Sequence, residues 1–179
     1  MPPPGEMKLN QNGVDDGELT MITTMSLKDI LLDSAKEVFE TMAFMALEEI
    51  VEETPEMGNA ALLGTITFKG PLEGCLGICC GFECARSIAA NMLGTDPDEE
   101  MSEADVDDAV GEVANMVMGA VKARIQDEVG NVEVSIPSVV QGLELRNSLG
   151  ERASELAINV NLDEEHCVRL SLLYRERND

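Results

Sequence analysis

The stretch Asp108-Ala-Val-Gly-Glu-Val-Ala-Asn115 places three polar side chains at positions i, i+4 and i+7 of an otherwise apolar segment. Residues at this spacing lie in one stripe along an α-helix. At about 100° per residue, the valines around this stretch gather on the opposite side and predict a buried face: Val106, Val110, Val113, Val117 and Val121. We therefore expect a long helix that presents Glu112 and Asn115 to solvent.

Gly119 continues the polar stripe one turn beyond Asn115. Glycine weakens a helix by about 1 kcal/mol relative to alanine, and at this position it leaves open space beside the amide. This predicts that a partner approaches the helix here. Met116 and Met118 flank the stripe and are candidates either for apolar docking or for the core. The residues alone also leave open that the stripe is only the solvated face of a surface helix.

The composition favours one soluble domain and excludes several partners. The chain has 179 residues, 44% of them hydrophobic, and 12 Lys and Arg against 35 Asp and Glu give a net charge of −23. Such a chain repels nucleic acid and anionic membrane surfaces. It contains no run of 18 apolar residues, and its first ten residues lack the features of a secretory signal. We expect a cytoplasmic protein.

The cysteines do not form a recognisable metal or disulfide pattern. Their number is odd, and the cluster lacks the two-residue spacing of zinc ligands and has only one histidine, His166, far along the chain. No nucleophile, base and orienting acid can be assembled from these residues. We therefore expect no metal site and reduced, buried cysteines that act as small hydrophobic side chains: Cys75, Cys79, Cys80, Cys84 and Cys167.

The chain is expected to divide into a tail and one domain. Residues 1–25 are rich in Pro, Gly, Asn and Asp and predict a disordered tail or a leader segment, and residues 26–179 predict a single domain. Ser26 is a candidate N-cap for a helix that runs to about Glu53 and stops before Pro55. Its expected core positions include Ile30, Val38, Met42 and Met45.

The rest of the chain predicts two hairpins separated by helices. Strands are expected at 62–69, 75–82, 132–136, 154–162 and 167–175, and helices at 84–93 and from the N-cap Ser102 to about residue 128. Residues 138–149 show no regular pattern. This order predicts an α+β fold, a mainly antiparallel β-sheet with long helices packed on it.

Two segments resemble a known family. Residues 111–119, followed after about twenty residues by Ser135-Ile-Pro-Ser-Val-Val-Gln-Gly142, closely resemble the chemotaxis phosphatases of the CheC, CheX and FliY group, and CheX most of all. The family pattern is Asp or Ser, three residues, Glu, two residues, Asn, and later Pro. Asp108, Glu112, Asn115 and Pro137 occupy these places, with a spacing before the proline about one residue shorter than the pattern. The resemblance covers about residues 26–175.

The resemblance implies an activity and a role for each residue. A CheX-like protein hydrolyses the phosphoaspartate of a CheY-like response regulator, and Asn115 would enter the regulator's site and orient the attacking water. Glu112 would pair with the regulator's lysine, Asp108 and Gly119 would contact the partner, and Pro137 would be structural. The regulator would supply Mg²⁺, so no cofactor is expected on this chain.

The resemblance also implies one site per chain and a homodimer. CheC carries the signature twice, but in the first predicted helix Asp33 and Glu37 are followed by Glu40 where the pattern needs Asn. A CheX-like dimer would pair its subunits through a continuous sheet, for which the terminal hairpin is the candidate. An alternative is a non-catalytic module that binds a regulator, like the middle domains of flagellar switch proteins; the presence of Glu112 and Asn115 favours the phosphatase.

Overall fold

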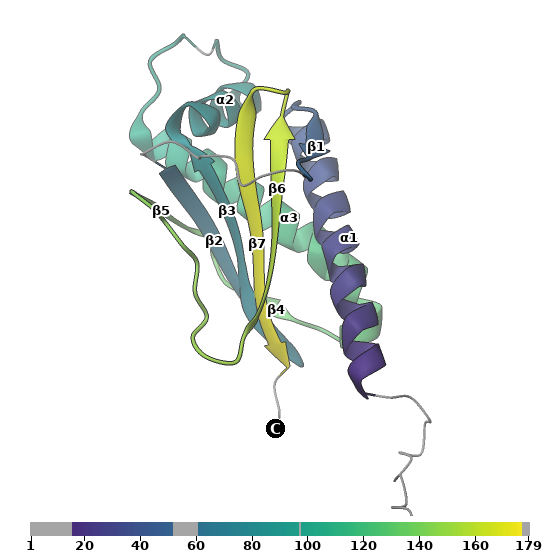
Figure 1. Cartoon of the computed structure of the whole chain (residues 1–179). Coiled ribbons are helices and arrows are strands. Elements are labelled where there is room, and N and C mark those ends of the chain that lie inside the picture. The colour runs from purple at the N-terminus through teal and green to yellow at the C-terminus, as the bar shows by residue number, and fades with distance from the viewer. Residues whose placement is uncertain (1–15, 52–60, 97, 177–179) are drawn as a thin grey trace, which may run out of the picture.

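The computed structural model describes residues 16–51, 61–96 and 98–176, and it confirms the predicted α+β fold. Within these ranges a seven-stranded antiparallel sheet carries three helices (Figure 1). In chain order the elements are α1 (Asp16–Met42), β1 (Leu47–Glu49), β2 (Ala61–Lys69), β3 (Leu72–Gly81), α2 (Phe82–Leu93), α3 (Glu103–Val129), β4 (Glu133–Val134), β5 (Ser138–Gly142), β6 (Ser154–Leu162) and β7 (His166–Glu176).

The sheet has the strand order β1-β6-β7-β3-β2, and both β4 and β5 pair with the far side of β2. Each half of the chain therefore has the same order: a long helix, a short strand at the sheet edge, and a hairpin. The edge strand of each half pairs with the hairpin of the other half, β1 with β6 and β5 with β2. As a result α3 lies over β2, and α1 lies on the β6 side.

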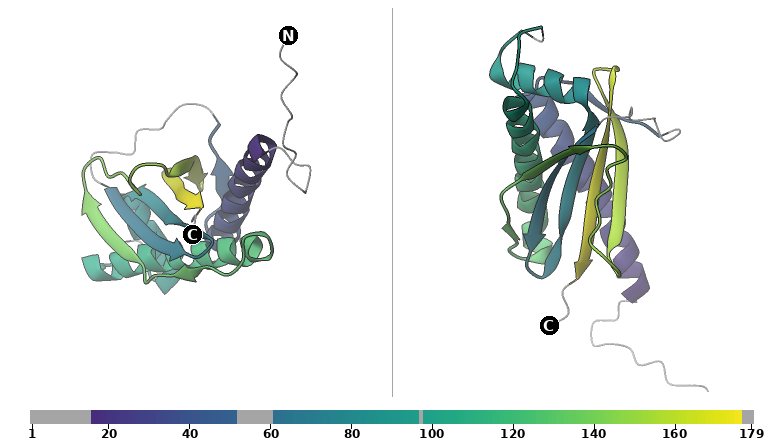
Figure 2. Two further views of the ribbon diagram at one scale, coloured as in Figure 1. Left: turned by 90° about the horizontal axis from the view of Figure 1, so that it is seen from below. Right: turned by 90° about the vertical axis from the view of Figure 1, so that its left-hand side faces the viewer.

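The helices cover one face of the sheet, and the loop between β5 and β6 crosses the other (Figure 2). On the helix side, alternate residues of the central strands join the side chains of α1, α2 and α3 in one large hydrophobic core. On the loop side, Leu145 packs on a small cluster that contains Leu63 and Cys79. Asn147 donates a hydrogen bond from Nδ2 to Cys75 Sγ over 3.2 Å, which fixes the loop to the sheet.

A glycine in β2 lets α3 approach the sheet closely. A Cβ atom built on Gly64 would lie 2.9 Å from Val110 Cγ1 and 3.3 Å from the Val110 carbonyl oxygen. Any larger residue would push the helix away at this point, because backbone atoms cannot move aside as a flexible side chain can. The position of α3 over the sheet therefore depends on Gly64.

The predicted start of α3 and the predicted C-terminal ends of α3 and α2 are confirmed, whereas α2 begins at Phe82, two residues before its predicted start. Ser102 caps α3: its Oγ accepts a hydrogen bond from the Asp105 backbone N–H, and the Asp105 side chain accepts one from the Ser102 N–H, which is a capping box. Gly130 follows α3 with a φ of 90°, and Gly94 ends α2 in the left-handed conformation. The two predicted hairpins, β2 with β3 and β6 with β7, are also confirmed.

The bounds predicted for the first helix are wrong at both ends. The helix begins at Asp16, so Ser26 lies inside it, and it ends at Met42 instead of continuing toward Glu53. It ends because Phe44 adopts a left-handed φ of 54°, and the Met45 N–H bonds back to the Phe39 carbonyl. A bulky residue rarely takes this conformation, so the sequence contains no usual stop signal. Residues 1–15 of the expected tail lie outside the described residues.

The predicted core face of this helix is correct only in part. Val38 and Met45 are buried and Ile30 is half-buried, but Met42 is 47% exposed. The helix buries the side chains of Leu27, Leu31, Ala35, Val38 and Phe39. Met45 reaches the core from the turn that leads into β1, beyond the end of the helix.

The segment after α3 also differs from its prediction. Of the strand expected at 132–136 only β4, two residues long, is present. Residues 138–142, which show no regular pattern, form β5 and pair with β2 from Thr65 to Ala61. Ser135 separates the two strands: its N–H donates to the Thr67 carbonyl, and its Oγ accepts from the Thr67 N–H.

We predict that Gly64→Val lowers the free energy of unfolding by about 1–3 kcal/mol, the usual cost of overpacking a core. Urea denaturation followed by circular dichroism measures the effect. The matched control is Gly119→Ala on α3, where a Cβ atom meets nothing within 4 Å, so stability should stay the same or rise by up to about 1 kcal/mol. Equal stability of Gly64→Val and the wild type would contradict the proposed close approach.

Candidate functional site

The two faces of α3 are as predicted from the sequence. The five valines of its apolar side are buried: Val106, Val110, Val113, Val117 and Val121. On the opposite side Asp108, Glu112 and Gly119 are exposed, and Asn115 is half-buried. Met118 is fully buried and belongs to the core, and Met116 packs against the core from a half-buried position. The core interpretation therefore holds for Met118.

The polar side chains of the stripe have no internal partner in the described part of the chain. Neither Asp108, Glu112 nor Asn115 makes a side-chain hydrogen bond or an ion pair with another described residue. Asp107, next to the stripe, differs: its Oδ1 accepts a hydrogen bond of 2.8 Å from Gln141 Nε2 on β5. Two carboxylates and a carboxamide are thus held on a rigid helix with their bonding capacity unused.

An open depression of about 480 Å³ lies between α3 and the chain that enters β5. It is lined by Asp107, Asp108, Gly111, Glu112, Pro137 and Val139. A Cβ atom built on Gly111 would lie 3.5 Å from Val139 Cγ2 and 3.6 Å from Pro137 Cβ. Pro137 and Val139 therefore lie close against the helix backbone at Gly111. The structure brings Asp108, Glu112 and Pro137 together, while Asn115 and Gly119 lie further along α3, outside the depression.

Two features of this surface were not found in the sequence. Val139 and the hydrogen bond between Asp107 and Gln141 depend on how β5 pairs with β2, which the irregular pattern of residues 138–149 did not reveal. A third residue of this surface, Lys122, does follow a pattern in the sequence, because it continues the stripe seven residues after Asn115. It is half-buried and makes no ion pair with any described residue.

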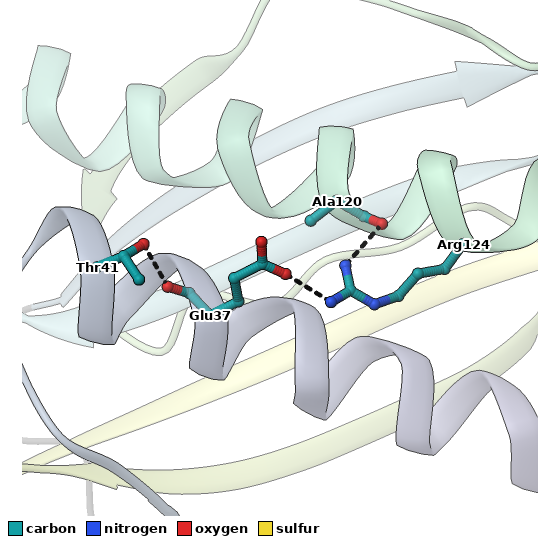
Figure 3. Close-up of polar contacts among 4 residues, drawn as sticks. All are labelled: Glu37, Thr41, Ala120 and Arg124. Atoms are coloured by element: carbon teal, nitrogen blue, oxygen red, sulfur yellow. Dashed lines mark hydrogen bonds and ion pairs between the residues drawn. The ribbon is translucent and has the colours of Figure 1, made fainter.

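The first helix does not repeat the site. The Glu37 carboxylate, which has the spacing of a signature residue, is bound by Arg124 of α3 over 2.5 Å (Figure 3). Arg124 also donates to the Ala120 carbonyl, and the Thr41 hydroxyl donates to the Glu37 carbonyl. The Glu37 side chain therefore joins α1 to α3, whereas Glu112 has no such contact in the described residues.

Four of the five cysteines, Cys75, Cys79, Cys80 and Cys84, are buried as predicted, and Cys167 is half-buried. A hydrogen bond to Cys84 and burial raise the pKa of the Cys80 thiol well above its usual value. Burial raises the pKa of Cys79, against the opposing effect of Arg169, and burial together with the neighbouring cysteines raises the pKa of Cys167. These three thiols are therefore protonated and weakly nucleophilic at neutral pH.

The described residues offer neither a metal cluster nor a membrane-spanning helix. No group of three or more His, Cys, Asp or Glu side chains there is arranged to hold a metal ion. Within the same residues, every helix is too short or too polar to cross a membrane.

Comparison with known proteins identifies the family. The model of the family described as chemotaxis phosphatase CheX matches residues 62–161, which include α3 and Pro137. The chain belongs to this family. Among curated protein sequences none matches the chain.

Solved structures of CheX proteins share the fold. CheX from Vibrio vulnificus has a TM-score of 0.69 and 25% identity, covering 85% of this chain and 98% of that chain. CheX from Desulfovibrio desulfuricans has a TM-score of 0.68 and 20% identity, covering 85% and 99%. The CheX–CheY–BeF3–Mg²⁺ complex from Borrelia burgdorferi has a TM-score of 0.63 and 17% identity, covering 83% and 97%.

Proposed function

We propose that this CheX family member hydrolyses the phosphoaspartate of a CheY-like response regulator by inserting Asn115 into the regulator's active site. The observation that carries the proposal is the position of Asn115: it is half-buried on the side of α3 opposite the buried valines, and its side chain makes no hydrogen bond to another described residue. A relative with the same fold was crystallised with CheY, BeF3 and Mg²⁺, which supports a regulator as the partner.

The chemistry requires a water molecule in line with the phosphorus atom. The water oxygen attacks, the bond between phosphorus and the aspartate oxygen breaks, and the carboxylate of the regulator leaves as inorganic phosphate forms. A carboxamide suits the task of holding this water, because it accepts a hydrogen bond at Oδ1, donates from Nδ2, and stays neutral beside a crowded anion. Asn115 would thus contribute by positioning the nucleophile.

The other residues of the stripe would orient the partner. Glu112 lies three residues before Asn115 on the same helix face, and it would pair with the regulator's lysine, which fixes the angle at which Asn115 enters. Asp108 and Gly119 would contact the partner on either side, and Pro137, packed near Gly111, would hold the chain beside the helix. The regulator would carry the Mg²⁺ ion, so this chain needs no cofactor of its own.

We also propose a homodimer through the terminal hairpin. Among the residues that the structure describes, β1 pairs only with residues 160–162 of β6. In the described part of the chain, the outer side of residues 154–158 of β6 has no strand partner. An unpaired strand of this kind is a site for pairing with another chain. Sedimentation equilibrium should then give the mass of a dimer.

A cytoplasmic location, where response regulators act, remains a prediction.

We predict that Asn115→Ala lowers phosphate release from a phosphorylated CheY-like regulator by about 100-fold or more, because the water loses its orientation. The variant should still bind the regulator loaded with beryllofluoride, which mimics the phosphoryl group. Glu112→Ala should impair both release and binding. Gln126→Ala, an exposed amide further along α3, is the matched control and should behave as the wild type.

Three outcomes decide between the candidate functions. A loss of turnover with retained binding in Asn115→Ala supports the phosphatase mechanism. Tight binding by the wild type without faster phosphate loss would favour a non-catalytic binding module with the same fold. If the wild type neither binds nor dephosphorylates any regulator from its own organism, both proposals are wrong.

We predict that Gly119→Leu weakens regulator binding without loss of fold stability. A Cβ atom at Gly119 meets nothing within 4 Å, and leucine favours helix more than glycine, so the free energy of unfolding should stay equal or rise. The larger side chain would occupy the space beside Asn115. Isothermal titration with the beryllofluoride-loaded regulator measures the change, and unaltered affinity would contradict a partner contact at this position.

A further inference from the structure

One segment of the surface contrasts with the rest of the chain. Residues Val134–Leu143 contain no charged side chain, in a protein with 12 Lys and Arg and 35 Asp and Glu. The segment exposes Val134, Ile136, Val140 and Leu143, of which Ile136 is 87% and Leu143 is 69% exposed. These four make up half of the exposed large hydrophobic side chains in the described residues. We call this segment the uncharged edge.

The uncharged edge lies at one side of the sheet and adjoins the candidate site. It contains β4 and β5, which pair with β2, and no further strand covers them within the described part of the chain (Figure 1). Pro137 and Val139, in the middle of the segment, line the same depression as Asp108 and Glu112. Val139 pairs with Gly64, which faces α3, whereas Val140 pairs with Leu63 and so lies on the opposite face of the sheet. The edge therefore adjoins the surface of the signature residues through Pro137 and Val139.

The negative charge expected on both the receiver domain and this chain makes an uncharged contact surface useful. A receiver domain that binds Mg²⁺ beside a phosphoaspartate presents carboxylates around its site, and α3 presents Asp107, Asp108 and Glu112. Like charges that meet across an interface oppose binding. Apolar contact adds affinity that does not depend on charge. Met118, buried in the core, cannot provide that contact.

We propose that the uncharged edge is the second half of the docking surface for the receiver domain of the response regulator. An apolar part of the receiver packs on Ile136 and Leu143 while the residues of α3 enter the phosphorylation site. The edge contributes affinity and selects the regulator, and the chemistry stays with Asn115. This proposal rests on the phosphatase function proposed above, and it adds where the substrate protein is held.

The test is the double variant Ile136→Ser/Leu143→Ser in the full chain. Both side chains are largely exposed, so the fold should persist, which thermal unfolding checks. We expect the KM for the phosphorylated regulator, and the Kd for its beryllofluoride-loaded form, to rise about tenfold or more, with kcat within about twofold of the wild type, because the binding lost is the same in the ground state and the transition state. The matched control is Phe44→Ser/Leu93→Ser, which removes two exposed side chains at the α1–β1 turn and the end of α2.

The outcomes separate this proposal from the phosphatase proposal. If the wild type releases phosphate and the double variant has an unchanged KM, the edge is not a docking surface, although the phosphatase proposal stands. If the wild type binds without releasing phosphate, the phosphatase proposal fails and the change in Kd alone decides the role of the edge. An equal loss in the control variant, or no regulator binding by the wild type, overturns the inference. So does conversion of a dimer to a monomer by the double variant in sedimentation, because the edge would then join two copies of this chain.

Discussion

The close approach of α3 to β2 at Gly64 determines where the candidate site stands. Because β2 has no side chain at this point, Val110 packs directly on the strand, and the valines on either side of it follow into the core. Burial of this apolar face holds the helix in place far more than helix propensity does. Because the valine face packs on the sheet, the helical period places Glu112 and Asn115 on the side of α3 that faces away from the sheet.

The same strand also positions the second part of the site. Gly64 pairs with Val139 of β5, and Val139 in turn lies next to Gly111 of α3. Pro137 enters the depression two residues earlier, before β5 begins. Asn115 and Pro137 are therefore both placed by β2, although 21 residues of chain lie between them. This explains how a short pattern in the sequence becomes one continuous surface.

Local signals made part of this structure predictable. The spacing of the valines and the N-cap Ser102 predict the position and the start of α3. Gly94 and Gly130 stand directly after the ends of α2 and α3. The end of α1 was not predictable, because it depends on a left-handed Phe44 and on Asn91 of α2, which donates a hydrogen bond to the Ala43 carbonyl. Likewise β5 is a strand because β2 offers it a partner, not because its own residues alternate. The stripe was therefore visible in the sequence, whereas Val139 and the uncharged edge were not.

The strong negative charge of the chain bears on both the group proposed for catalysis and the surface proposed for docking. A protein with a net charge of −23 gains no long-range attraction toward an acidic receiver domain. The groups assigned to closest contact are accordingly neutral: a carboxamide at the reacting phosphoryl group and apolar side chains along the edge of the sheet. The carboxylates beside them would serve to orient the complex, since a Glu112 paired with a single lysine fixes direction even where the net field is repulsive. Recognition would then depend on short-range fit after encounter, which governs how long the complex lasts more than how fast it forms.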